Sequence, residues 1–182
     1  MVWGDEVHVE GARKGVLVSD AHVHFENSSF VNCSHTCCEV MSLYSAEFIN
    51  CQFTRARYAG LSFMEQRTIE GEHTQHIVRS CLCEGNEHSG LSVRGPVLVV
   101  AESCRSESNR EGFVSFGWGD LRLIDCLSSR DQLGCTSRAS HVRATDTVIR
   151  DTGPNGCALY ICLLYTSPSP RDATLSRMPS SA

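Results

Sequence analysis

The chain has 182 residues, of which 41% are hydrophobic and 20% charged, and its formal net charge is −5 at pH 7. This length is enough for one domain with a sizeable core. The acidic and evenly mixed charge argues against a nucleic acid as partner, and no apolar run is long enough to cross a membrane.

Residues 1–14, MVWGDEVHVEGARK, open the chain. They lack the apolar segment of a signal peptide. Short β-type stretches in this region predict either an N-terminal segment or an incomplete structural unit before residue 15.

From residue 15 onward the sequence repeats. HFENSSF at positions 24–30 is similar to EFINCQF at positions 47–53, and glycines recur 22 residues apart at positions 90, 112, 134 and 156. A second column of the repeat holds small or apolar residues, namely Ser28, Cys51, Cys81, Cys104, Cys126 and Val148. The one long step in this column, between Cys51 and Cys81, predicts an inserted loop at about residues 67–76.

The length and composition of this unit indicate its structure. A unit of about 22 residues is too short for two packed helices. Its apolar residues form short β-type runs such as VLVV and LRLI, which are bounded by the turn formers Gly, Asn, Asp and Ser. Each unit is therefore predicted to be one coil of a β-solenoid, stacked on the next at the strand spacing of about 4.8 Å.

The segments AEFINCQF, HIVRSC, VVAESC and LRLIDC, followed by G-x-x-V, resemble the repeats of right-handed parallel β-helices. That group includes pectate-lyase-like enzymes with the pectin lyase fold, alginate epimerases and the β-helix region of some F-box proteins. The resemblance covers about residues 15–161. It implies an all-β, right-handed parallel β-helix of six to seven coils of 22–23 residues, cut at its C-terminal end, but it does not imply one function.

Eleven cysteines occur in the chain, and most lie one coil apart. A buried cysteine behaves as a small hydrophobe. We therefore expect Cys51, Cys81, Cys104 and Cys126 to form an inward-facing ladder of reduced thiols. Disulfides between coils are an alternative, although parallel Cβ vectors suit that bond poorly. Unpaired cysteines favour an intracellular protein.

A metal site is a further alternative for some of these thiols. Cysteine ligands of structural metals usually come in close pairs with matching spacing. The candidates here do not show two such pairs, so no metal and no cofactor is predicted. They are Cys37, Cys38, Cys81, Cys83, His73 and His76.

The remaining polar residues show no catalytic pattern. His22 and His24 would lie on one strand face, but the sequence indicates no partner for either. No phosphate-binding glycine loop, nucleophile elbow or zinc-binding helix motif occurs, and no catalytic residue is predicted. The later aspartates do not share one column of the repeat: Asp120, Asp125, Asp131, Asp146 and Asp151.

One column predicts a binding surface. The position four residues after each repeated glycine holds Met64, Arg94, Phe116, Arg138 and Tyr160. Alternation along the strand should place this column on the outer face, beside the inserted loop. Arginine and aromatic side chains are enriched at binding centres, so the strip suits a glycan or a protein segment. An ordinary solvated face is the alternative.

The last residues, 162–182, read CLLYTSPSPRDATLSRMPSSA and shift in composition to Ser and Pro. They resemble the translation of a sequencing-library adapter, so we interpret them as a non-native, disordered tail. The solenoid would then end on an exposed strand edge, which predicts self-association.

The leading interpretation is a fragment of a β-helix repeat protein that acts as a non-catalytic recognition module, binding protein or carbohydrate along one face. The alternative is a polysaccharide lyase, hydrolase or epimerase whose catalytic coils lie partly outside this sequence.

Overall fold

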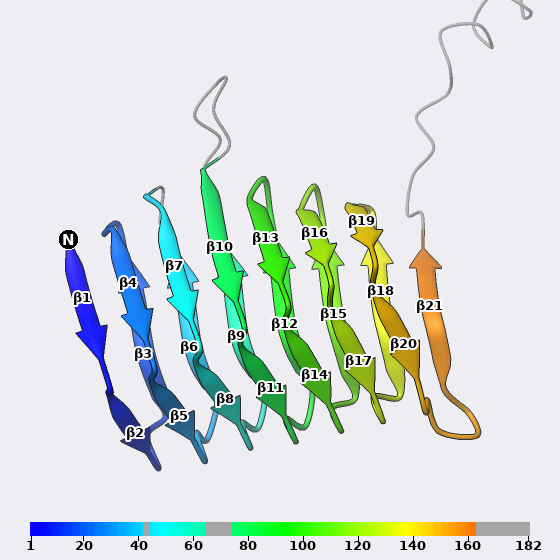
Figure 1. Ribbon diagram of the computed structural model, residues 1–182, viewed down its shortest axis with the longest axis horizontal. Coiled ribbons are helices and arrows are strands. Elements are labelled where there is room, and N and C mark those ends of the chain that lie inside the picture. The colour runs from blue at the N-terminus through cyan, green and yellow to red at the C-terminus, as the bar shows by residue number, and fades with distance from the viewer. Residues whose placement is uncertain (42–43, 65–73, 163–182) are drawn as a thin grey trace, which may run out of the picture.

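The computed structural model describes residues 1–41, 44–64 and 74–162. These residues form three seven-stranded parallel sheets, wound as a solenoid of about seven coils (Figure 1). The described part of the chain contains no helix that could span a membrane. The predicted all-β solenoid and its number of coils are confirmed.

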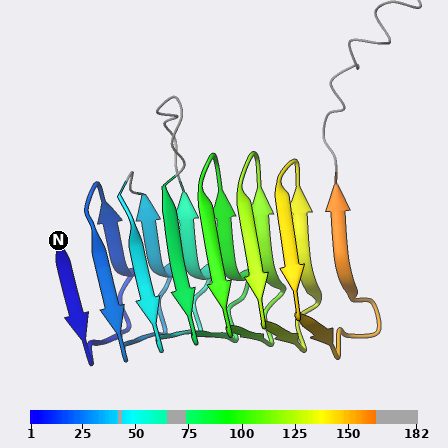
Figure 2. The same cartoon turned by 45° about the horizontal axis from the view of Figure 1, so that its top comes forward.

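Each coil contributes one strand to each sheet, and Figure 2 shows the coils side by side along the long axis. Sheet A contains β1 (Val2–Asp5), β4 (Val23–Glu26), β7 (Ala46–Ile49), β10 (Gln75–Arg79), β13 (Leu98–Glu102), β16 (Asp120–Ile124) and β19 (His141–Thr145). Sheet B contains β2 (His8–Glu10), β5 (Ser29–Val31), β8 (Gln52–Thr54), β11 (Leu82–Glu84), β14 (Arg105–Glu107), β17 (Leu127–Ser129) and β20 (Val148–Arg150). Sheet C contains β3 (Lys14–Ser19), β6 (Thr36–Met41), β9 (Ala59–Met64), β12 (Ser89–Arg94), β15 (Glu111–Phe116), β18 (Leu133–Arg138) and β21 (Cys157–Cys162).

A single residue in the left-handed backbone region turns the chain from sheet A to sheet B. Asn, Asp and Ser tolerate this conformation, which explains their recurrence. Side chains of this corner also link coils, since Asn50 Nδ2 donates to Asn27 Oδ1 at 2.7 Å. The corner residues have φ between 49° and 53° and are Glu6, Asn27, Asn50, Ser80, Ser103, Asp125 and Asp146. Of the five aspartates for which no shared column was predicted, Asp125 and Asp146 do share this corner column.

The interior is filled by ladders of apolar side chains. The rings of Phe25 and Phe48 stack with centroids 5.9 Å apart, and those of Phe30 and Phe53 stack at 5.4 Å. The repeated glycine lies where coils approach most closely. A Cβ on Gly90 would lie 2.9 Å from the carbonyl oxygen of Gly112, so a larger residue would push the coils apart.

The predicted thiol column is buried. Cys51, Cys81, Cys104 and Cys126 are at most 3% exposed and unpaired. In the last coil the equivalent position is occupied by Thr147. Val148 pairs with Leu127 in sheet B, so the residue before it is the one that corresponds to Cys126. Placing Val148 in this column was wrong by one residue.

His76 is part of β10, and not of an inserted loop as predicted. Its side chain is buried against Phe63, and its Nδ1 accepts the backbone N–H of Ala46 at 3.1 Å. Burial lowers the pKa of His76 to about 4. The rest of the predicted insertion, with Arg67 and His73, and the tail from residue 163 lie outside the described residues.

The last coil departs from the repeat. Leu133 pairs with Cys157, and Thr136 pairs with Tyr160. The turn from Asp151 to Gly156 is longer than the turn from Arg130 to Gln132, which displaces the strand that follows it. Gly156 is therefore not the repeated glycine. The prediction that Tyr160 lies in register with Arg138 was wrong, because Arg138 pairs with Cys162.

Candidate binding site at the corner of sheets C and A

Four residues of the predicted strip are register partners at the ends of the sheet C strands. Arg94 pairs with Met64 on one side and Phe116 on the other, and Phe116 pairs with Arg138. The Arg94 guanidinium lies 5.4 Å from the centroid of the Phe116 ring, and the Arg138 guanidinium lies 5.0 Å from it on the next coil. We call Arg94, Phe116 and Arg138 the arginine–phenylalanine ladder.

Tyr160 joins this ladder from a different position. It lies opposite Thr136, two residues before the ladder column, yet its ring lies 5.6 Å from the Arg138 guanidinium. The planar guanidinium of Arg138 thus contacts two aromatic rings. Such cation–π contacts contribute about 0.5–1 kcal/mol each at exposed sites.

Arg138 is also held by a buried carboxylate. Its Nη2 donates to Glu111 Oε1 at 2.9 Å, and the Glu111 side chain is only 3% exposed. Removing Arg138 would leave a buried charge unpaired. Arg94 is exposed. The ladder therefore combines one fixed arginine with one arginine available to a partner.

Trp118 lies just beyond this ladder, in the turn between β15 and β16. It has φ of 70°, and 79% of its surface is exposed. A bulky residue in the left-handed region is strained, and such strain is concentrated at functional sites. The backbone fixes the turn, since Trp118 N–H donates to the Ala139 carbonyl at 2.8 Å. The turn thus presents an exposed indole from a backbone position that is held by this hydrogen bond.

A cleft of about 500 Å³ lies beside the indole. Its lining is mostly apolar but carries three groups that can form hydrogen bonds to a ligand. Asp120 Oδ2 accepts from Arg122 Nη2 at 3.4 Å, whereas Asp120 Oδ1 and Arg122 Nε have no partner among the described residues. The cleft is lined by Pro96, Val97, Leu98, Trp118, Asp120, Arg122 and His141.

The repeat brings these polar groups together from neighbouring coils. Asp120 on β16 and His141 on β19 are direct register partners on the outer face of sheet A. Asp120 is also the partner of Leu98 on β13. Sequence reasoning missed this cleft, because Trp118 and Asp120 belong to no repeated column of the strip. The signal available was an isolated Trp between two glycines, in GWG.

A second polar cluster lies on sheet A near the N-terminus. His24 Nδ1 lies 3.0 Å from Glu47 Oε2, and its Nε2 lies 3.8 Å from Glu26. The ring of Trp3 stacks on His24 with centroids 6.5 Å apart. The alignment of HFENSSF with EFINCQF places His24 opposite Glu47. The sequence therefore did indicate Glu47 as a partner for His24.

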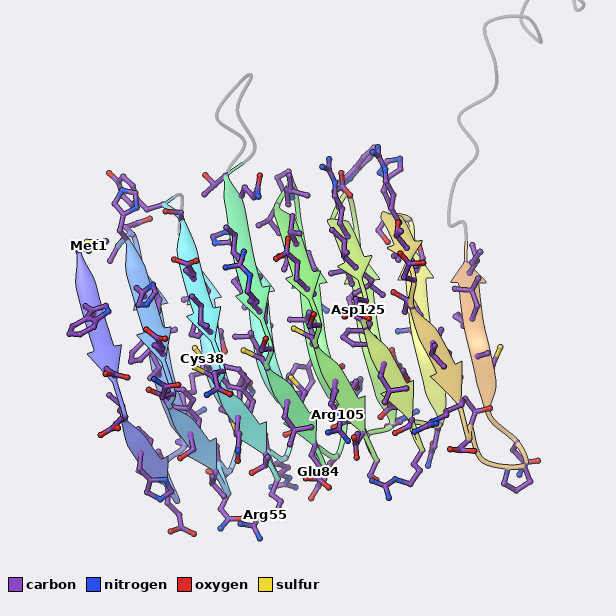
Figure 3. All side chains as sticks on the ribbon, in the orientation of Figure 1. Met1, Cys38, Arg55, Glu84, Arg105 and Asp125 are labelled. Atoms are coloured by element: carbon purple, nitrogen blue, oxygen red, sulfur yellow. The ribbon has the colours of Figure 1, made fainter. Side chains whose placement is uncertain are left out.

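Polar groups on sheet B pair with one another. Glu107 accepts from both Arg105 and Arg130, the latter at 2.6 Å. Figure 3 shows the labelled Arg55, Glu84 and Arg105 following one another along this side of the solenoid. No group of three or more metal-ligating side chains occurs in residues 1–41, 44–64 and 74–162.

Three stacked parallel sheets define the class of the molecule, a parallel β-solenoid. The model of the family described as the right handed beta helix region matches residues 5–132, and the chain belongs to that family. The comparison with curated proteins gave no match.

Proposed function

We propose that the protein is a non-catalytic recognition module that binds a glycan chain at the corner of sheets C and A. The observation that carries the proposal is Trp118, an exposed indole on a strained backbone beside a partly polar cleft. The apolar face of a sugar ring packs on an aromatic platform, while its hydroxyls need donors and acceptors at the rim. Asp120, Arg122 and His141 provide those groups.

The arginine–phenylalanine ladder would extend this site along the solenoid axis. It repeats once per coil, so a chain molecule lying along the axis would meet similar groups at steps of about 4.8 Å. Arg94 is the exposed cation of the ladder and would contact a polar or acidic substituent.

An extended protein segment is the other partner expected for such a strip. Peptides often bind by adding a strand to a free sheet edge. From β4 to β18, every strand already pairs with a neighbour on both sides, so these coils offer no lateral edge. Stacking on Trp118 therefore favours a glycan over an added peptide strand.

The cleft supports binding better than hydrolysis. Glycosidases generally use two carboxyl groups that flank the scissile bond. Among the described lining residues, Asp120 is the single carboxylate. The cleft thus favours a recognition module over a glycoside hydrolase, one of the three enzyme classes in the alternative.

Tryptophan fluorescence tests this proposal. The chain has two tryptophans, so Trp3→Phe leaves Trp118 as the single reporter. We expect a panel of cello-, xylo- and galacturonate oligosaccharides to contain a sugar that changes its emission. Trp118→Ala removes the reporter, so its affinity is measured by isothermal titration calorimetry; it should bind that sugar more weakly by roughly tenfold or more, equal to about 1.4 kcal/mol.

Trp3→Ala is the matched control, because Trp3 is also exposed but lies on the first coil. It should leave affinity unchanged. Binding of an extended peptide library that depends on Trp118, with no sugar bound, would overturn the glycan proposal in favour of a protein partner.

A further inference from the structure

The thiol column at the corner of sheets A and B repeats the same geometry from coil to coil. Each sulfur makes the same two contacts. Cys104 Sγ lies 3.3 Å from the Glu102 carbonyl in its own coil and 3.3 Å from the Val78 carbonyl in the preceding coil. Cys126 repeats this with Ile124 at 3.4 Å and Ala101 at 3.3 Å.

The same pattern holds earlier in the column. Cys81 Sγ lies 3.3 Å from the Arg79 carbonyl and 3.5 Å from the Phe48 carbonyl. Cys51 Sγ lies 3.3 Å from the Ile49 carbonyl and 3.5 Å from that of Phe25. Because the contacts are equivalent, successive sulfurs are displaced by one coil, which is about 4.8 Å along the axis. Sulfur atoms are seen in successive coils in Figure 3.

This spacing fits one kind of ligand. A disulfide needs sulfurs about 2.05 Å apart, much closer than one coil step. Two metal–sulfur bonds of about 2.3 Å, placed end to end, span about 4.6 Å. Inward side chains stand roughly perpendicular to the stacking direction, so an ion between two sulfurs would meet each at a bent angle, as thiolates prefer.

We propose that neighbouring thiols of this column bind a soft, thiophilic metal ion in linear two-coordinate geometry, at Cys51–Cys81 and at Cys104–Cys126. Soft thiolate ligands select ions such as Cu(I) and Hg(II). Tetrahedral Zn(II) needs four ligands, whereas each gap between coils offers two. The site requires only pairs of thiols, and it is separate from the Trp118 cleft.

Hydrogen bonding along the column links all four thiols: it lowers the pKa of Cys51 and Cys104 and raises the pKa of Cys81 and Cys126. Hydrogen bonding from Cys81 lowers the pKa of Cys51, and hydrogen bonding from Cys126 and Cys81 lowers the pKa of Cys104. The backbone N–H of Cys51 also donates to Cys81 Sγ at 3.4 Å. Binding of Hg(II) would form two S–Hg bonds and release two thiol protons. The resulting bis-thiolate is neutral, which suits a buried site.

Two double variants with the same number of thiols test the proposal. Cys51→Ser with Cys126→Ser retains the neighbours Cys81 and Cys104. Cys81→Ser with Cys126→Ser retains Cys51 and Cys104, which are two coils apart. Serine should be tolerated, because Ser28 and Thr147 occupy this column and donate to the same type of carbonyl at 2.7 and 3.0 Å.

Each protein is incubated with mercuric chloride, passed through gel filtration in excess glutathione, and analysed for bound mercury. The first variant should retain one more Hg(II) per chain than the second, and the wild type two more than the variant with all four serines. Far-UV circular dichroism must stay unchanged. Equal mercury in the two double variants would overturn the proposal, as would loss of β structure on binding. Equal retention of Zn(II) by the first variant would overturn the linear geometry.

Discussion

The coil β13–β15 and the coil β19–β21 have the same strand order but different packing. In the first, Val99 and Phe113 are at most 1% exposed. In the last, Leu159 occupies the same ladder as Phe113, with Cys135 between them, yet is 52% exposed. Phe113, with a coil on both sides, is thus fully buried, whereas Leu159, in the same ladder but with a coil on one side, is not. In a solenoid, burial is a property of position along the axis as well as of sequence.

The largest expected effect compares these two residues directly. Phe113→Ala should lower the free energy of unfolding by about 3–5 kcal/mol, because it leaves a cavity in the core. Leu159→Ala, in the same ladder, should cost less than about 1 kcal/mol. Urea unfolding followed by circular dichroism measures both. Similar losses would show that the last coil is packed as tightly as the inner ones.

A second difference concerns acid stability. The folded-state pKa of His76, about 4, lies below its value of about 6.5 in the unfolded chain. The unfolded chain therefore binds the proton more readily between these values. Stability from this group is full above pH 6.5 and is lost as pH falls towards 4, by about 3 kcal/mol.

His76→Gln keeps a side-chain acceptor for the Ala46 N–H and removes the titration. Its stability should fall less between pH 6.5 and 4 than that of the wild type, as measured by urea unfolding at each pH. His141→Gln, an exposed change on the last coil, should leave the wild-type pH dependence in place. An unaltered pH profile in His76→Gln would argue against a buried neutral imidazole.

A smaller effect is expected at an inner polar column. Asn109 N–H and Nδ2 donate to Asp131 Oδ1 at 2.8 and 3.0 Å, and Ser128 Oγ donates to Asp131 Oδ2 at 2.6 Å. Burial raises the pKa of Asp131 despite these bonds. Its contribution to stability is therefore present at low pH and lost as pH rises through the folded-state pKa.

Asp131→Asn would continue the column of Asn86 and Asn109 without a charge. Stability at pH 7 should rise by about 1 kcal/mol, the size of one net hydrogen bond, and thermal unfolding can measure it. Asp125→Asn at the exposed corner should change stability by less than about 0.5 kcal/mol. A loss of stability in Asp131→Asn would show that the charge is needed there.

The smallest effect is expected when the thiol column is extended into the last coil. Thr147→Cys would place a fifth thiol after Cys126, at a position that is half-buried. The unfolding free energy should change by less than about 0.5 kcal/mol. A larger loss would indicate that the hydrogen bond from Thr147 Oγ1 to the Thr145 carbonyl helps to hold the last corner.

The features that were predicted correctly from the sequence are those whose contacts recur in every coil. The repeated glycine, the inward thiols and the line of Arg94, Phe116 and Arg138 all follow from a period that sterics impose on every coil. Tyr160 and Val148 were misplaced because corner lengths vary by one to three residues without changing the strands. A periodic argument cannot detect such shifts when a chance glycine, such as Gly156, lies at the expected position.

The candidate site was predictable only in part. The ladder lies in the repeat, so the spacing indicated it. The cleft depends on the conformation of one turn at Trp118 and on the partner that sheet A supplies, His141 opposite Asp120. Neither the left-handed backbone nor that pairing has a periodic signature. His24 and Glu47 could have been paired from the sequence, since their neighbours Phe25 and Phe48 had been aligned.

The stacking of short strands has a mechanical consequence. Because each coil is tied to its neighbours by one short strand per face, tension applied to the two chain ends would load the outermost hydrogen bonds first. Coils should then detach in turn, each releasing a contour length of roughly 75 Å for about 22 residues. Optical-tweezer traces would show regular unfolding steps. One step should release a greater length of chain, when the coil with the long interval between Cys51 and Cys81 detaches.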